Sequence, residues 1–166
     1  MRVVLFALIA AVASPALAQR MPPVLPFAPA GVDYVETVCA GGIDGRHEVV
    51  RVLATGQVSK VTRRSPDVQH ARASRAEVSR IWRELDLARF ERRVVPPQKP
   101  YVMDGVDCTL TRRSNGREHS VTLIQQLRDN PKYRDLIRAL DDINALGAKA
   151  SGPRLRPAGT VASPQR

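Results

Sequence analysis

Residues capable of acid–base or metal chemistry are thinly scattered along this sequence, which contains three histidines and two cysteines. His47-Glu48 begins like the metalloprotease motif H-E-x-x-H but lacks the second histidine. Asp104 and Asp107 flank a glycine and could bind a cation or transfer protons, although carboxylates at such a turn are more often simply solvated. His70 is expected in a polar loop, and His119 at the exposed end of a hairpin. The sequence therefore predicts no catalytic residue, no cofactor and no metal site.

A glycine-rich segment, Gly-Gly-Ile-Asp-Gly at residues 41–45, is the candidate binding feature. It resembles a phosphate-binding loop only faintly, because a strand-like run follows it where such loops need a helix N-terminus. Three glycines in five residues lose much backbone entropy on folding, which predicts a tight or unusual path. Ile43 either packs back onto the sheet or protrudes toward a partner. The candidate partner-binding residues are Gly41, Gly42, Ile43 and Asp44.

The N-terminus has the pattern of a secretory signal peptide over residues 1–18. A basic start precedes the apolar run 3–13, and Ala16-Leu17-Ala18 forms a cleavage signal. A transmembrane anchor needs roughly 20 apolar residues, more than this run supplies. Cleavage after Ala18 exposes Gln19 rather than a lipid-attachment cysteine. We therefore expect a periplasmic or secreted protein without a membrane span.

Export changes the interpretation of the cysteines, because an oxidising compartment permits a disulfide. We expect Cys39 and Cys108 to form one, rather than to remain as two separate buried thiols. A zinc site is not expected, since the pair lacks C-x-x-C spacing and further ligands.

Much of the formal net charge of +10 lies outside the expected domain. Residues 31–148 hold 20 Lys and Arg against 16 Asp and Glu. A proline-rich linker at 19–30 and a basic tail at 149–166, expected to be disordered, carry more of the excess. The chain is 4% aromatic, too few to favour single-stranded nucleic acid as a partner. The Arg pairs 63–64, 92–93 and 112–113 could form a basic surface, but solvated charge is the simpler interpretation.

Alternating apolar residues and turn signals predict strands at 32–39, 47–53, 57–64, 106–113 and 118–124, with a polar loop at 65–73. Asn115-Gly116 predicts a type I′ hairpin that sets Leu110 opposite Val121 and directs Cys108 inward, opposite Leu123.

Two amphipathic helices are predicted as well. The first spans 74–88 and opens with a Ser74–Glu77 capping box. Leu87 near its end and Phe90 beyond it are expected to fold back onto the core. The second opens at Asn130-Pro131 and stops at Gly147. The order β-β-β-α-β-β-α predicts an α+β fold, in which an antiparallel sheet of about five strands carries both helices on one face.

Several short motifs resemble the emfourin-like inhibitors of thermolysin-type metalloproteases. These are the turn at 40–45 followed by a hairpin, the helix corner at 87–90, a strand pair starting at Asp104, and a last helix opened by Pro131. The resemblance covers about residues 34–146, with Ile43 where the family often has an aromatic residue. It implies a small α+β domain that binds a protein through exposed loops and is not an enzyme.

Three function classes remain open. The first is an exported, non-enzymatic protein-binding domain, with a secreted metalloprotease as a candidate partner. The second is a basic surface protein that binds anionic envelope polymers or lipids. The third is a small exported hydrolase with an unrecognised site around Asp104, Asp107 or His119.

Overall fold

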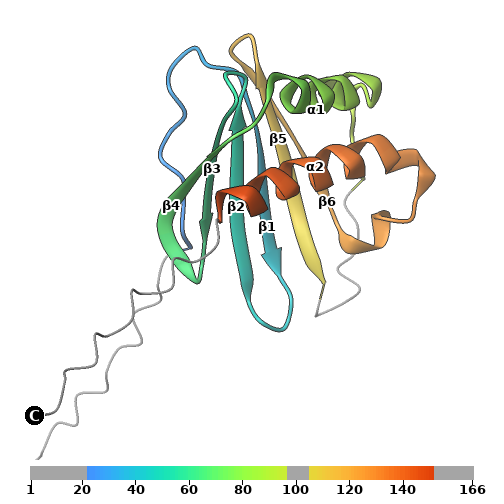
Figure 1. Cartoon of the computed structure of the whole chain (residues 1–166). Coiled ribbons are helices and arrows are strands. Elements are labelled where there is room, and N and C mark those ends of the chain that lie inside the picture. Colours follow the sequence, from blue (N-terminus) through green and yellow to red (C-terminus); the bar gives the residue numbers. More distant parts are fainter. Residues whose placement is uncertain (1–21, 97–104, 152–166) are drawn as a thin grey trace, which may run out of the picture.

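The computed structural model describes residues 22–96 and 105–151, in which a six-stranded antiparallel sheet carries two α-helices on one face (Figure 1). The strands are β1 (Tyr34–Gly41), β2 (Arg46–Leu53), β3 (Gln57–Thr62), β4 (Ser65–Arg72), β5 (Val106–Ser114) and β6 (Arg117–Leu123). The helices are α1 (Arg75–Leu87) and α2 (Arg134–Ala150), with short 3-10 turns η1 (Phe90–Arg92), η2 (Gln125–Leu127) and η3 (Pro131–Tyr133). The α+β prediction is confirmed, with one strand more than expected.

The signal peptide, the tail beyond residue 151 and Asp104 lie outside the described residues.

The strand order is β4-β3-β2-β1-β5-β6. The first four strands form a meander, and β5–β6 is a hairpin that joins the meander by pairing with β1. Helix α2 contacts all four meander strands and also packs on α1. The connection from β4 to β5 runs through α1. Both helices lie on one face of the sheet, and neither covers the opposite face (Figure 1).

The β5–β6 hairpin has the predicted register. Leu110 pairs with Val121 and Cys108 with Leu123, and all four side chains are buried. Asn115 and Gly116 have φ values of 53° and 75°. A type I′ turn requires positive φ at both central residues, so the Asn-Gly signal determines this register.

The polar loop predicted at residues 65–73 is wrong, because most of it forms the edge strand β4. Within β4 the apolar side chains are only Val68 and Ala71, and Pro66 weakens a strand prediction. An edge strand tolerates proline, since one side of its backbone makes no ladder bonds. The segment therefore forms a strand because it pairs with β3, although its sequence pattern does not predict one.

Helix α1 begins as predicted. The Ser74 side chain accepts from the Glu77 amide, and the Glu77 carboxylate accepts from the Ser74 amide. Phe90 is fully buried as expected, but Leu87 is 67% exposed, which corrects the prediction that it folds onto the core. Arg89 has a φ of 51°, and this left-handed residue reverses the chain so that Phe90, not Leu87, reaches the core.

Helix α2 begins three residues later than the Asn-Pro signal predicts, because Pro131 opens the 3-10 turn η3, which Asn130 caps. Gly147 does not end the helix, which continues to Ala150. A Cβ on Gly147 would lie 2.5 Å from the Val50 Cγ2 atom. This glycine therefore allows close helix–sheet packing instead of terminating the helix.

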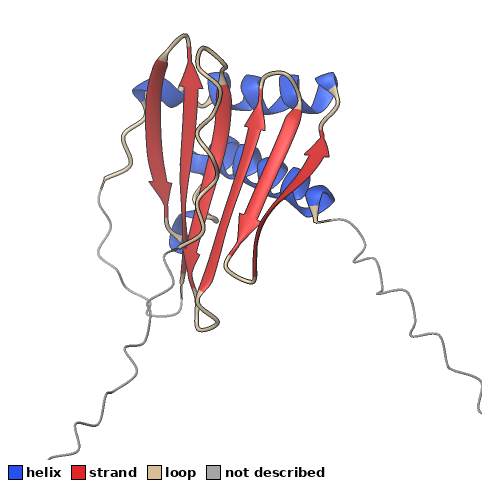
Figure 2. Cartoon of the chain, turned by 90° about the vertical axis from the view of Figure 1, so that its left-hand side faces the viewer, coloured by secondary structure: helices blue, strands red, loops and turns tan. Residues whose placement is uncertain are grey.

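The outer face of the sheet, opposite the helices, is crossed by residues 22–30, which we call the N-terminal strap (Figure 2). Leu25 is only 8% exposed and packs in a cluster with Val49 and Val61. Arg51 donates a hydrogen bond to the Pro26 carbonyl and a second one, of 2.8 Å, to Glu36. The described part of the proline-rich segment is thus extended but attached to the domain.

No helix within residues 22–96 and 105–151 is long and apolar enough to cross a membrane.

Candidate functional site

The glycine-rich segment is the turn between β1 and β2, and hydrogen bonds define its path. The Gly42 amide donates to the Gly105 carbonyl at 3.1 Å, and the Gly45 amide donates to the Gly42 carbonyl at 3.0 Å. Gly41 has a φ of 115°, and a Cβ there would lie 2.4 Å from the Gly105 oxygen. The loop therefore needs glycine at position 41 in order to lie against the start of β5.

Ile43 occupies the middle of this loop and is 87% exposed. Of the two alternatives that the sequence leaves open, the structure shows protrusion. Asp44, beside it, forms an ion pair with Arg64 at 3.5 Å. An exposed branched aliphatic side chain on a hydrogen-bonded turn has no folding role in the described structure, and it is available for contact with another molecule.

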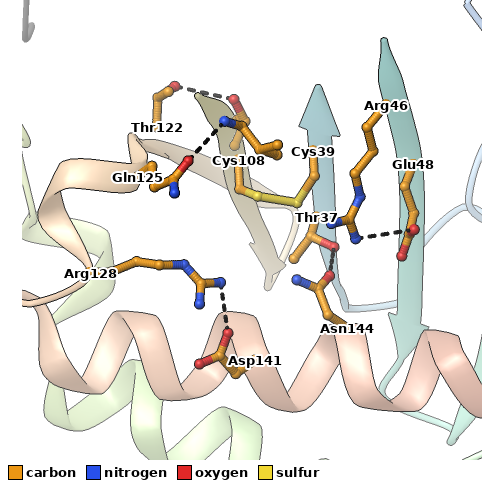
Figure 3. Close-up of a disulfide and its surroundings, with 12 residues drawn as sticks. Thr37, Cys39, Arg46, Glu48, Cys108, Thr122, Gln125, Arg128, Asp141 and Asn144 are labelled. Atoms are coloured by element: carbon orange, nitrogen blue, oxygen red, sulfur yellow. Dashed lines mark hydrogen bonds and ion pairs between the residues drawn. A yellow bond between two sulfur atoms is a disulfide. The ribbon is translucent and has the colours of Figure 1, made fainter. Parts of the chain in front are cut away.

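The disulfide stands at the base of the loop (Figure 3). Cys39 lies two residues before Gly41, and its sulfur is 2.15 Å from that of Cys108 on β5. Both cysteines are buried, and two positions further along the same two strands Gly41 pairs with Val106. The bridge, the strand pairing and the loop hydrogen bonds together hold residues 41–45 against β5.

Three arginines gather next to the loop. Arg46 follows the loop directly, while Arg63 and Arg64 form the turn between β3 and β4. They line a recess of about 310 Å³ together with Asp44 and Gly45 of the first turn and the strand residues His47, Glu48 and Thr62. Figure 3 shows Arg46 extended along β2 toward Glu48, to which it is paired at 3.3 Å.

The sequence points to the pair 63–64 but not to this recess. Alternate turns of an up-and-down meander lie at the same end of the sheet, so the first turn (β1–β2) and the third (β3–β4) meet there. Because residues 65–73 are predicted as a loop, the second of these hairpins is not recognised. Predicting the strand β4 would have placed both turns at one end of the sheet, and with them Arg46, Arg63 and Arg64.

Among the described residues, the histidines and Asp107 named from the sequence do not converge. His70 lies on edge strand β4, with its Nδ1 atom 3.3 Å from the Ser59 hydroxyl. His119 is half-buried rather than exposed, which corrects that expectation, and its Nε2 atom lies 3.0 Å from the Arg93 carbonyl. Asp107 is exposed on β5. Within the described ranges, no three His, Cys, Asp or Glu side chains are grouped as a metal site would require.

A second recess, of about 580 Å³, lies at the other end of the β5–β6 hairpin, lined by Glu91, Arg112, Ser114, Asn115, Arg117, Glu118 and His119. Its buried cation is Arg112, whose guanidinium pairs with Asp86 at 2.6 Å and Glu91 at 3.1 Å. These bonds connect β5 to α1 and η1. Two carboxylates already neutralise this arginine, so the cluster is explained by its role in packing.

The chain matches no protein-family model, and no curated protein gives a significant match to it.

Proposed function

We propose that this chain is an exported, non-enzymatic binding domain that recognises a protein partner through the loop at residues 41–45. One observation carries the proposal, namely that Ile43 is 87% exposed on a loop whose backbone is already ordered. Fixing a loop in its bound conformation before association reduces the entropy lost on binding. Interface hot spots lie in well-packed pockets from which water is excluded, and Ile43 could enter such a pocket on a partner.

The partner class that we propose is a secreted metalloprotease of the thermolysin type. The support is the resemblance to emfourin-like inhibitors, whose glycine-rich turn after the first strand corresponds to Gly41 and Gly42 here. The disulfide supports the proposed location, because bridges of this kind persist in the periplasm and outside the cell. The proposed role is occlusion of the protease and requires no chemistry from this chain.

The test is an inhibition assay of thermolysin-type proteases with three forms of the protein. The wild type is expected to inhibit, and Ile43→Asp is expected to inhibit at least tenfold more weakly, because it would place a carboxylate in an apolar contact. Leu87→Asp is the matched control, since Leu87 is also an exposed aliphatic residue but lies at the end of α1. It should inhibit like the wild type.

Two results would count against the proposal in different ways. If the wild type inhibits no protease of this class, the inhibitor role is lost. If it inhibits but Ile43→Asp and Leu87→Asp inhibit equally well, the protein is an inhibitor that uses a different surface from this loop.

A further inference from the structure

The recess between the β1–β2 and β3–β4 turns has an excess of positive charge that its own carboxylates do not neutralise. Arg46, Arg63 and Arg64 line it, and the acidic residues of the lining are Asp44 and Glu48. Glu48 is shared, because it pairs both with Arg46 and with Lys60, each at 3.3 Å. Two carboxylates therefore serve the three arginines of the recess and also Lys60, which lies outside its lining.

Arg63 is the cation with the most unused hydrogen-bonding capacity. It makes no ion pair within the described part of the chain, and its Nη1 atom donates a long bond of 3.5 Å to the Gly45 carbonyl. A Cβ on Gly45 would approach that same Nη1 atom to 3.0 Å, so the glycine leaves room for the guanidinium over the turn. A guanidinium has five N–H donors, and most of those on Arg63 remain available.

Arg64 is also only weakly engaged. Its contact with Asp44 is 3.5 Å long, and both side chains are largely exposed, which leaves the pair open to exchange for a stronger acceptor. The recess at the hairpin end differs, because there Arg112 is buried and held by two short ion pairs. An anion would have to displace those carboxylates, whereas it could join Arg63 without breaking any ion pair in the described structure.

We infer that the recess formed by Arg46, Arg63 and Arg64 binds an oxyanion. The guanidinium fork matches the spacing of two oxygens on a carboxylate, phosphate or sulfate, and such bidentate bonds are strong. The volume of about 310 Å³ is at the small end of ligand sites, which fits a single anionic group better than an extended molecule. The oxyanion is either a free inorganic ion or an acidic side chain of a bound protein. This inference does not rest on the proposed protease partner.

The experiment is an NMR titration of backbone amides in the disulfide-bonded protein, with inorganic phosphate in one arm and acetate in the other. Chloride holds the ionic strength constant in both arms. Saturable shifts are expected at Gly45, Arg46, Arg63 and Arg64. Arg63→Gln should weaken binding roughly tenfold, as loss of a charge-assisted bond predicts. Arg83→Gln is the matched control, because Arg83 is exposed on α1, away from both turns, and the substitution removes the same charge.

The two arms identify the source of the oxyanion. Saturation by phosphate alone assigns a free phosphate, while saturation by both anions shows that the site accepts a carboxylate and therefore an acidic side chain. The inference is overturned if neither anion gives saturable shifts at the two turns. It is equally overturned if Arg63→Gln binds like the wild type, or if Arg83→Gln loses as much affinity as Arg63→Gln.

Discussion

Cys39 and Cys108 lie directly opposite each other on neighbouring antiparallel strands, with their Cα atoms 4.1 Å apart. They are separated by 69 positions in sequence, so the bridge closes a long loop. It also crosses the boundary between the β1–β4 meander and the β5–β6 hairpin. The disulfide thus joins the two parts of the sheet at the same place where it supports the exposed Ile43 loop.

The disulfide is expected to contribute about 4 kcal/mol to the free energy of unfolding in the chain-entropy model. The double variant Cys39→Ala with Cys108→Ala should therefore unfold at a clearly lower denaturant concentration. Mass spectrometry of the unreduced wild type after alkylation provides the control and should show no modified cysteine. Two alkylated thiols in native protein would contradict the bridge.

The N-terminal strap is expected to stabilise the domain through Leu25. Leu25→Ala should lower the free energy of unfolding by about 2 kcal/mol, the lower part of the range for buried leucines, because this residue lies at the edge of a small cluster. Phe27→Ala is the matched control on the same strap, and Phe27 is fully exposed. Chemical denaturation should show a change only for Leu25. Equal effects would mean that the strap does not pack as described.

Ile43→Asp is expected to leave the fold intact. An exposed substitution usually changes stability by less than about 0.5 kcal/mol, so its melting temperature should stay close to that of the wild type. Val58→Asp is the contrasting variant, since Val58 is fully buried and the new carboxylate would have no partner. A large loss of stability in Ile43→Asp would show that the loop residue packs inward.

The junction of α1 and α2 should be sensitive to acid. A hydrogen bond from Lys149, followed by bonds from the Ser74 amide and hydroxyl, lowers the pKa of Glu77 from 4.5 to about 2. A depressed pKa in the folded state contributes stability above pH 4.5, and that contribution is lost as the pH falls toward 2. The effect should be small and weakened by salt, because the pair is exposed.

Glu77→Gln isolates this charge, since glutamine can still accept the capping bond from the Ser74 amide. The wild type should be more stable than the variant at pH 6, and the difference should shrink between pH 4.5 and 2. Thermal denaturation at several pH values measures it. A difference that does not change with pH would assign the effect to the cap rather than to the ion pair.

Turn and capping motifs in the sequence correctly predict the elements that they begin or connect. Asn115-Gly116 sets the register of the β5–β6 hairpin, and Ser74 with Glu77 sets the start of α1. Strand β4 escapes prediction because its residues lack alternation and its order comes from pairing with β3. Gly147 is misread because its role depends on Val50, almost a hundred positions away in sequence.

Part of the candidate site is likewise predictable from the local sequence, and part is not. The three glycines at residues 41–45 predict an unusual turn, and the structure shows positive φ at Gly41, Gly42 and Gly45. The exposure of Ile43 is not predictable, because inward and outward positions are both compatible with its neighbours. The recess with Arg63 requires knowledge of which turns share an end of the sheet, and that depends on the strand missed at β4.

The central position of β1 sets an order of events for a chain that is delivered from its N-terminus. Strand β2 is available to β1 almost at once, but β5 follows only after β3, β4 and α1. Until then β1 is an open edge, and Cys39 has no intramolecular thiol with which to react. Under the proposed export, the emerging chain would therefore expose an unpaired β1 edge and a free Cys39 thiol until β5 has emerged. During that interval, pairing of the open β1 edge with another chain and oxidation of Cys39 would compete with completion of the sheet.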